Sequence, residues 1–285
     1  MTQTPVPFLK MNGLGNEILV VDLRGTKLKV SPALAKQLAA DPLTHFDQAM
    51  VLHDPKTAGT VSFVRIFNTD GSEVGACGNG TRCVGDYLAD KFVDGGMAIE
   101  TIAGVLPIWK ANGPHSYTVD MGVPKFGWKD IPLEEEFRDT RGIELQVGPV
   151  DNPIIHTPSV VNVGNPHCIF WVDRLDIIDL AKVGPMLEHH RLFPQRANIS
   201  LAHVTSQNSI EVKVWERGVG LTRASGSTSC AVVACAHRKK LTGRKVTVTL
   251  PGGDLFIELR ADDHMLMTGP TELEHRGTLD AARFA

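Results

Sequence analysis

The sequence contains no long apolar segment and no excess of positive charge. No apolar run approaches the roughly 18 residues that span a membrane, and the opening residues, MTQTPVPFLK, lack the apolar core of a secretion signal. The formal net charge is −3, which gives no reason to expect a nucleic-acid-binding surface. We therefore expect a cytoplasmic protein with neither a membrane nor a nucleic-acid partner.

Cysteines are few and are not spaced as ligands or as a disulfide framework. The five cysteines are an odd number without dense spacing, which is typical of free thiols in a reducing compartment. Residues 78–82 separate Cys77 from Cys83, whereas His167 and Cys168 are adjacent, and neither spacing suits zinc. The sequence therefore predicts no structural metal site.

One stretch of the chain combines a thiol with a helix start. A β-rich run over 61–67 ends in a polar turn, and Cys77 follows it directly before Gly-Asn-Gly and a helical pattern. The unpaired N–H groups and dipole of a helix start lower a cysteine pKa from about 8.5 to roughly 3.5–7.5. This favours a reactive thiolate beside an anion site, and an inert buried cysteine is the alternative. The helix is expected to present one apolar face, formed by Val84, Tyr87, Leu88 and Val93.

The same arrangement recurs later in the chain. Ser225-Gly226-Ser227-Thr228 corresponds to Cys77-Gly78-Asn79-Gly80 at an offset of 148 residues (225 − 77). Glycine bends at Gly104 and Gly253 and Gly-Asn pairs at 15–16 and 164–165 share an offset of 149 (253 − 104 and 164 − 15). A repeat of this length predicts two similar domains.

The length of 285 residues and the apolar fraction of 42 % suit two domains with their own cores. We expect an N-terminal domain over 1–125, a C-terminal domain over 126–270, and a final segment, 271–285, that packs back on the first domain. Within the second domain, the helical stretch 177–189 is expected to break near Gly184-Pro185.

Two such units facing each other across a cleft would bring two helix starts to one ligand. One acid/base group on each side of a single carbon can remove a proton from one face and return a proton to the other. The helix starts would bind an α-carboxylate and stabilise the charge that develops on it. The repeat therefore indicates two-base racemisation or epimerisation without a cofactor.

Five stretches together carry a resemblance to a known family. NGLGNE at 12–17, FNTDGSEVGACGNGTRC at 67–83, VGNPHC at 163–168, FPQRAN at 193–198 and ERGVGLTRASGSTSCA at 216–231 resemble diaminopimelate epimerase. The resemblance covers nearly the whole chain. It implies an α+β fold of two pseudo-symmetric alpha-beta rolls, each a mostly antiparallel curved sheet around a central helix, with the active site in the cleft between them.

The resemblance also implies the activity. Such an enzyme converts LL- to meso-diaminopimelate in lysine and peptidoglycan biosynthesis, uses no pyridoxal phosphate, other cofactor or metal, and can be a homodimer. By resemblance, Cys77 is one catalytic acid/base group and Arg217 pairs with the distal carboxylate. Glu216 meets a substrate amine and, with His167, tunes the protonation of the catalytic cysteines. On residues alone, an exposed charge pair at 216–217 and a core histidine at 167 are the alternatives.

The remaining residues that the resemblance implicates bind the substrate. Main-chain N–H groups for the α-carboxylate come from Gly78, Asn79, Gly226 and Ser227. Side-chain hydrogen bonds come from Asn16, Gln48, Asn68, Asn165 and Asn198.

The chain departs from the family pattern at one catalytic position. The second cysteine of the family falls at Ser225, and Cys230 lies more than a turn into the helix. A hydroxyl is a much weaker acid than a thiol, and loss of one acid/base group typically costs ~10²–10⁴-fold in rate. The sequence therefore predicts an impaired epimerase.

Three interpretations of Ser225 stay open. The chain can be an engineered Cys→Ser variant, a natural relative that uses a Cys–Ser pair on another amino acid such as hydroxyproline, or a non-catalytic binding protein. The retained polar residues favour the first interpretation, and the presence of Cys77 and His167 disfavours the third.

Overall fold

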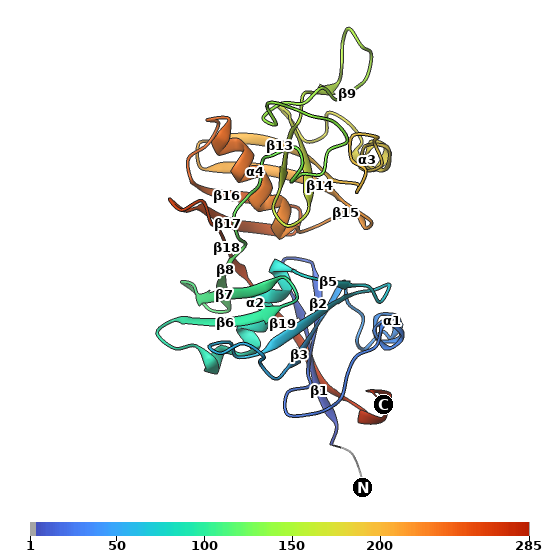
Figure 1. The fold of residues 1–285 in the computed structure, drawn as a ribbon, viewed down its shortest axis with the longest axis vertical. Helices are drawn as coiled ribbons and strands as arrows, with labels where there is room; N and C mark the ends of the chain where they lie inside the picture. The colour runs from blue at the N-terminus through green and yellow to red at the C-terminus, as the bar shows by residue number, and fades with distance from the viewer. Residues whose placement is uncertain (1–3, 285) are drawn as a thin grey trace. The chain divides into compact units, whose positions relative to one another are not determined.

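The computed structural model describes residues 4–284, and the chain divides into two compact units (Figure 1). Unit 1 comprises Met1–Asp120 and Thr268–Ala285, and unit 2 comprises Met121–Met267. Both units consist mostly of β-strands with a few helices. The chain changes units after Asp120 and after Met267, whereas the sequence analysis put the boundaries after residues 125 and 270.

Unit 1 is one sheet with two α-helices. Its elements are β1 (Val6–Asn12), β2 (Glu17–Asp22), α1 (Pro32–Ala40), β3 (Gln48–His53), β4 (Phe63–Asn68), β5 (Glu73–Val74), α2 (Gly78–Tyr87), the 3₁₀ turn η1 (Ala89–Lys91), β6 (Gly96–Thr101), β7 (Gly104–Lys110), β8 (Ser116–Asp120), β19 (Glu272–Leu279) and the 3₁₀ turn η2 (Ala281–Phe284). β18 (Met265–Pro270) carries the chain from unit 2 into unit 1.

Unit 2 likewise consists of β-strands and two α-helices. Its elements are β9 (Gln146–Val147), β10 (Ile155–His156), β11 (Ser159–Asn162), β12 (Pro166–Trp171), α3 (Leu180–Glu188), β13 (Asn198–Ser206), β14 (Ser209–Glu216), β15 (Gly220–Thr222), α4 (Gly226–Arg238), β16 (Lys245–Leu250) and β17 (Gly253–Leu259).

The two units share one series of strand pairings. In unit 1, β1–β2 is antiparallel, β2–β3 parallel, β3–β4 antiparallel, β4–β6 parallel and β6–β7 antiparallel. In unit 2, β11–β12, β12–β13, β13–β14, β14–β16 and β16–β17 follow the same alternation. The hairpins β6–β7 and β16–β17 bend at Gly104 and Gly253, as the sequence predicted. These glycines have φ angles of 127° and 135°, which residues with a side chain rarely adopt. This shared topology supports the internal repeat.

In each unit the sheet packs against two helices. α2 contacts β2, β3, β7 and β8, whereas α4 contacts β11, β12, β13, β16 and β17. α1 and α3 complete separate hydrophobic clusters, where Leu34 and Leu38 pack with β1–β3 and Leu180 and Leu187 pack with β12 and β13. α2 and α4 are buried along most of their lengths, which fixes the residues at their N-termini relative to the sheet.

The end of the chain pairs with its beginning. β19 runs antiparallel to β1, from Val6 opposite Leu279 to Asn12 opposite Glu272. Phe284 joins the hydrophobic cluster around α1. The final segment therefore belongs to unit 1.

Two local expectations are wrong. α3 runs unbroken from Leu180 to Glu188 with Pro185 inside it, although an interior proline typically costs about 3 kcal/mol. Close packing offsets this cost, because a Cβ on Gly184 would lie 2.6 Å from the Trp215 ring and Leu187 is buried. Val93 does not share the buried face of α2, because that helix ends at Tyr87 and Val93 is 73 % exposed.

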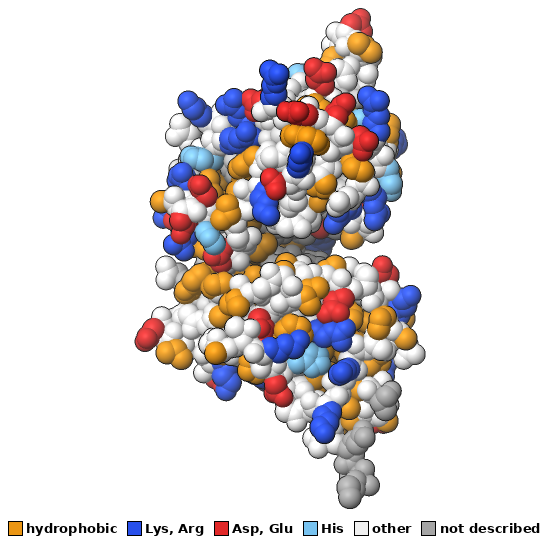
Figure 2. Space-filling model, viewed as in Figure 1, with side chains coloured by type: hydrophobic (Ala, Val, Ile, Leu, Met, Phe, Trp, Pro, Cys, Tyr) orange, Lys and Arg blue, Asp and Glu red, His pale blue; other side chains and the backbone are white. Residues whose placement is uncertain are grey.

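The surface mixes charges of both signs. On the face shown in Figure 2, Lys and Arg side chains are interspersed with Asp and Glu over both units, as the small net charge suggests. Within residues 4–284, no helix has the length and apolarity needed to cross a membrane.

Candidate active site

Cys77 and Ser225 occupy the same position at the starts of α2 and α4. Each is the N-cap residue, and their backbone angles are nearly equal, at φ −149°, ψ 103° for Cys77 and φ −149°, ψ 108° for Ser225. The Gly80 N–H donates to Cys77 Sγ at 3.3 Å, and the Thr228 N–H donates to Ser225 Oγ at 3.4 Å. Each side chain therefore lies against the positive end of a helix dipole.

The two residues after each cap begin the helix. Gly78 and Asn79 open α2, and Gly226 and Ser227 open α4. The N–H groups in the first turn of a helix have no partner within the helix, so a carboxylate suits both places. All four residues therefore lie in the first turns of α2 and α4, and their binding of a carboxylate stays a prediction.

In unit 1 the other expected site residues form one hydrogen-bonded group around Cys77. Gln48 Oε1 accepts from the Cys77 thiol at 3.8 Å and from Asn16 Nδ2 at 3.2 Å. Asn79 Nδ2 donates to Asn16 Oδ1 at 3.2 Å, and Gln48 Nε2 donates to Asn68 Oδ1 at 3.5 Å. Residues from β3, β4, α2 and the turn just before β2, distant in sequence, thereby meet at one end of the sheet.

Asp47 supports this group and was missed in the sequence. Its Oδ2 accepts from Asn16 Nδ2 and from the Glu17 N–H, both at 2.9 Å. The carboxylate therefore fixes the orientation of the Asn16 amide. The only local signal was its place beside Gln48, which does not distinguish it from other acidic residues at strand starts.

Cys77 differs from the other cysteines in its exposure. Cys77 is partly exposed, whereas Cys83, Cys168 and Cys235 are buried. Burial raises the pKa of Cys83 and of Cys235 to about 12 and raises the pKa of Cys168. Those three thiols stay protonated at neutral pH. Cys77, which is partly exposed, is therefore better placed than these three to react as a thiolate.

In unit 2 the expected residues gather around His167. The parallel pairing of β12 with β13 sets His167 opposite Asn198. His167 Nε2 lies 2.8 Å from Asn165 Oδ1, and Asn198 Nδ2 donates to the Pro166 carbonyl at 2.9 Å. Burial, and secondarily the charge of Arg217, lowers the pKa of His167 to about 3, so the ring is neutral at physiological pH.

Glu216 and Arg217 lie at the end of β14 beside the same group. Glu216 Oε1 accepts from the Thr222 hydroxyl at 2.6 Å. The Arg217 N–H donates to Asn198 Oδ1 at 3.0 Å, and its Nη1 donates to the Gln195 carbonyl at 3.0 Å. Arg217 is half-buried, and burial lowers its pKa, so an anion that pairs with it would relieve the cost of burying the charge.

Glu188 holds the turn after Arg217 and was also missed in the sequence. Its carboxylate is buried and accepts from Trp215 Nε1 at 2.7 Å, from the Gly218 N–H at 2.9 Å and from Arg196 Nη1 at 3.3 Å. These contacts join the end of α3 to the β14–β15 turn. No local pattern reveals them, because they depend on how the helix packs on the sheet.

Glu188→Ala is expected to lower the free energy of unfolding by roughly 1–3 kcal/mol. The substitution removes the acceptor of the half-buried Trp215 Nε1–H, and a donor left unpaired away from water costs about that much, whereas water can replace the bond to the exposed Gly218 N–H. Glu188→Gln should cost less, because its amide oxygen can still accept. The exposed Glu144→Ala of the same unit is the control, expected to stay within ~0.5 kcal/mol. Urea denaturation measures all three, and equal values for Glu188→Ala and Glu144→Ala would contradict the assigned role.

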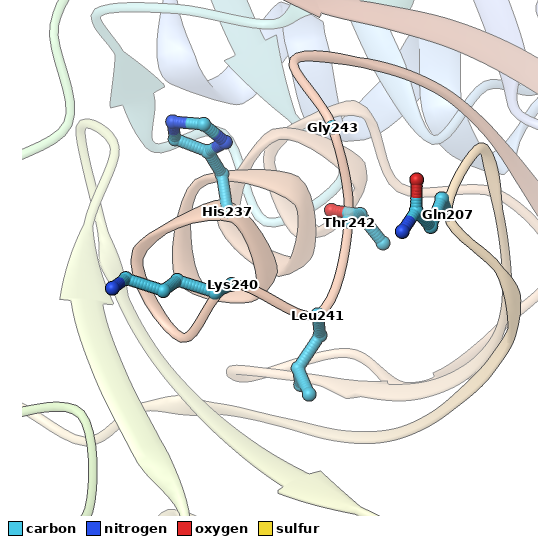
Figure 3. Close-up of a pocket in the computed structure, with 6 residues that line it drawn as sticks. All are labelled: Gln207, His237, Lys240, Leu241, Thr242 and Gly243. Carbon is cyan, nitrogen blue, oxygen red and sulfur yellow. The ribbon is translucent and has the colours of Figure 1, made fainter.

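A hollow of about 200 Å³ lies at the other end of α4, lined by Gln207, His237, Lys240, Leu241, Thr242 and Gly243 (Figure 3). α4 begins at Gly226 and ends at Arg238, so this hollow is about 18 Å along the helix from Ser225. It contains none of the residues that the sequence implicates in catalysis.

Comparison with known proteins places the chain among amino-acid isomerases. A family model described as diaminopimelate epimerase matches residues 8–127 and 159–274. The diaminopimelate epimerase of Afipia carboxidovorans is 56 % identical over 279 residues, covering 98 % of this chain and 96 % of that protein. The diaminopimelate epimerase of Rhodopseudomonas palustris is 55 % identical with the same coverage.

The fold is shared more widely. A solved hydroxyproline epimerase from Agrobacterium vitis has a TM-score of 0.64 at 14 % identity, and the match covers 99 % of this chain and 93 % of that one. At that identity the likeness concerns the fold alone. The family model and the relatives above 50 % identity lead to one conclusion: the chain belongs to the diaminopimelate epimerase family, isomerases that act on an amino acid in lysine biosynthesis.

Proposed function

We propose that this chain interconverts LL- and meso-diaminopimelate by a two-base mechanism without a cofactor. Cys77 and Ser225 are the two acid/base groups, one for each face of the α-carbon. The observation that supports the proposal is the matching pair of helix starts, with Cys77 and Ser225 at the N-caps and main-chain N–H groups in the first turns that would bind a carboxylate. The reaction requires the two half-sites to face one substrate, in two pseudo-symmetric rolls that close on it.

Each half-site then has a distinct task. In unit 1, Asn16, Gln48 and Asn68 orient the substrate beside Cys77 through the group of amides described above. In unit 2, Arg217 pairs with the distal carboxylate, and Glu216 meets the distal amine. Asn165 and Asn198 supply further hydrogen bonds to the substrate. His167 contacts Asn165, and the Arg217 N–H donates to Asn198.

The α-carboxylate is the electrostatic centre of the mechanism. When a proton leaves the α-carbon, the electron pair delocalises onto this carboxylate. The first-turn N–H groups of α2 and α4, from Gly78, Asn79, Gly226 and Ser227, stabilise that charge most where it is greatest, in the transition state. No step requires an electron sink from outside the chain.

Ser225 makes this a slow enzyme relative to one with two thiols. A serine hydroxyl is a much weaker acid than a thiol, so transfer at the Ser225 face has the higher barrier. A Cys–Ser pair also leaves trans-4-hydroxy-L-proline as an alternative substrate. The identity of above 50 % to diaminopimelate epimerases and the retention of Arg217 favour diaminopimelate.

Incubation with LL-diaminopimelate is expected to yield the meso isomer, detected by chromatography on a chiral phase. Trans-4-hydroxy-L-proline should remain unchanged, because it lacks the distal carboxylate that would pair with Arg217, and a half-buried guanidinium without that anion keeps the cost of its desolvation. Arg217→Lys serves as a control, because it keeps the charge but loses the bidentate geometry, and it should weaken diaminopimelate binding. Epimerisation of hydroxyproline in preference to diaminopimelate would refute the proposed substrate.

A cytoplasmic location and a homodimeric state belong to the same proposal. We infer both from membership of the diaminopimelate epimerase family. Sedimentation equilibrium of the purified chain decides between monomer and dimer.

A further inference from the structure

The two helix starts differ at a second position besides Cys77 and Ser225. The third residue after the cap is Gly80 in α2 and Thr228 in α4. A Cβ at Gly80 would lie 2.4 Å from Met50 Sδ, so unit 1 has no room for a side chain there. Unit 2 instead places a hydroxyl beside the cap, where the thiol half-site has none.

Thr228 connects Ser225 to His167. The Ser225 hydroxyl donates to Thr228 Oγ1 at 3.0 Å, and Thr228 Oγ1 lies 3.5 Å from His167 Nδ1. All three residues are buried, with exposed fractions of 3 %, 0 % and 0 %. The result is a continuous chain of hydroxyl, hydroxyl and imidazole that is shielded from water. The Thr228–His167 contact is the longer of the two, and hydrogen bonds of catalytic groups are often long without substrate and shorten when substrate binds.

The hydrogen bonds of His167 determine which group donates and which accepts in the series Ser225, Thr228, His167. Nε2 lies 2.8 Å from Asn165 Oδ1, a carbonyl oxygen, and 3.5 Å from the amide nitrogen of Asn198, so the shorter contact assigns the ring hydrogen to Nε2. Because the ring is neutral, Nδ1 has a lone pair to accept the Thr228 hydroxyl hydrogen. Thr228 Oγ1 in turn accepts the hydrogen of Ser225. Each donor along the chain thus points from Ser225 toward His167.

We propose that Thr228 relays protons between Ser225 and His167 and thereby makes Ser225 a working acid/base group. As the substrate Cα–H bond breaks, its proton joins Ser225 Oγ, the Ser225 proton passes to Thr228 Oγ1, and the Thr228 proton passes to His167 Nδ1. The electron pair stays on the substrate, and the positive charge appears on His167. The reverse sequence protonates the same face of the carbanion.

This inference rests on the proposed function. In that function, the relay would set the rate of proton transfer at the Ser225 face. Charging a buried imidazole beside Arg217 is unfavourable, so the relay is slower than a thiolate. A substrate carboxylate on Arg217 reduces the repulsion, and the carbanion attracts the imidazolium. A lone buried serine has no such route, because its hydroxyl would have to hold the charge itself.

The test follows exchange of the α-hydrogen in D2O by NMR, for the LL and the meso isomer separately. The Cys77→Ala protein identifies which isomer exchanges at the Ser225 face, because exchange at the Cys77 face stops in it. Thr228→Val, which replaces the hydroxyl with a methyl of similar size, should lower exchange at the Ser225 face by ~10²-fold or more. Exchange at the Cys77 face should change less than about threefold, and Thr228→Ser should retain both.

A second background separates a relay from a purely structural role. In Ser225→Cys protein the thiol needs no relay, so adding Thr228→Val should change exchange at that face by less than about threefold. An equal loss in both backgrounds would show that Thr228 acts only structurally and would overturn the relay, as would absence of exchange at the Ser225 face of the unaltered protein. Absence of exchange at both faces, in the unaltered protein and in Ser225→Cys alike, would refute the proposed function and the relay with it.

Discussion

Ser225→Cys is expected to raise the rate of LL- to meso-diaminopimelate conversion by ~10²–10⁴-fold. A thiol has a pKa near 8.5 before any perturbation, whereas a serine hydroxyl does not ionise near neutral pH. At the start of α4, the first-turn N–H groups and the helix dipole would stabilise this thiolate, as the equivalent groups of α2 stabilise a thiolate at Cys77. The gain corresponds to about 3–5 kcal/mol of barrier, at 1.36 kcal/mol per decade.

The geometry at position 225 suits the larger sulfur. The Thr228 N–H is 3.4 Å from Ser225 Oγ, and the equivalent Gly80 N–H is 3.3 Å from Cys77 Sγ, so the same backbone accepts either atom. Steady-state rates of the two proteins measure the gain. Ser206→Cys, at the exposed end of β13, adds a thiol elsewhere and should leave the rate unchanged. Full turnover before the substitution, with no gain after it, would show that Ser225 is not the second base.

The internal repeat made most of the fold predictable. Landmarks such as Gly104 and Gly253 mark equivalent hairpins, and the strand pairings of the two units follow one series. The cap positions of Cys77 and Ser225 were also evident, because a polar turn before a helical pattern defines a helix start locally. These features depend on spacing along the chain, which a sequence displays directly.

What the sequence did not reveal depends on tertiary packing. Asp47 and Glu188 act through hydrogen bonds to residues on other elements, and Pro185 stays within α3 because Gly184 packs closely against Trp215. Thr228 is a further case, since its importance follows from the proximity of His167, 61 residues away in the chain. Each of these residues has an ordinary local context, so only the folded arrangement distinguishes it.

Cys77→Ala is expected to lower diaminopimelate epimerisation by at least ~10²–10⁴-fold, because net inversion needs a group on each face. The loss should be selective. α-Hydrogen exchange in D2O should stop for the isomer that presents its hydrogen to Cys77 and continue for the isomer that presents it to Ser225. Microscopic reversibility requires epimerisation to fall equally in both directions.

Ser225→Ala is the matched control, because it removes the equivalent cap side chain of the other unit. It should stop exchange of the opposite isomer and leave the exchange that Cys77 supports. Each substitution removes one side-chain acceptor for a first-turn N–H, at about 0.5–2 kcal/mol of stability, so thermal unfolding should confirm that both proteins remain folded. If Cys77→Ala left the exchange of both isomers unchanged, Cys77 would not be a catalytic base. The crossed pattern, with one isomer lost in each variant, is the result that two bases on opposite faces require.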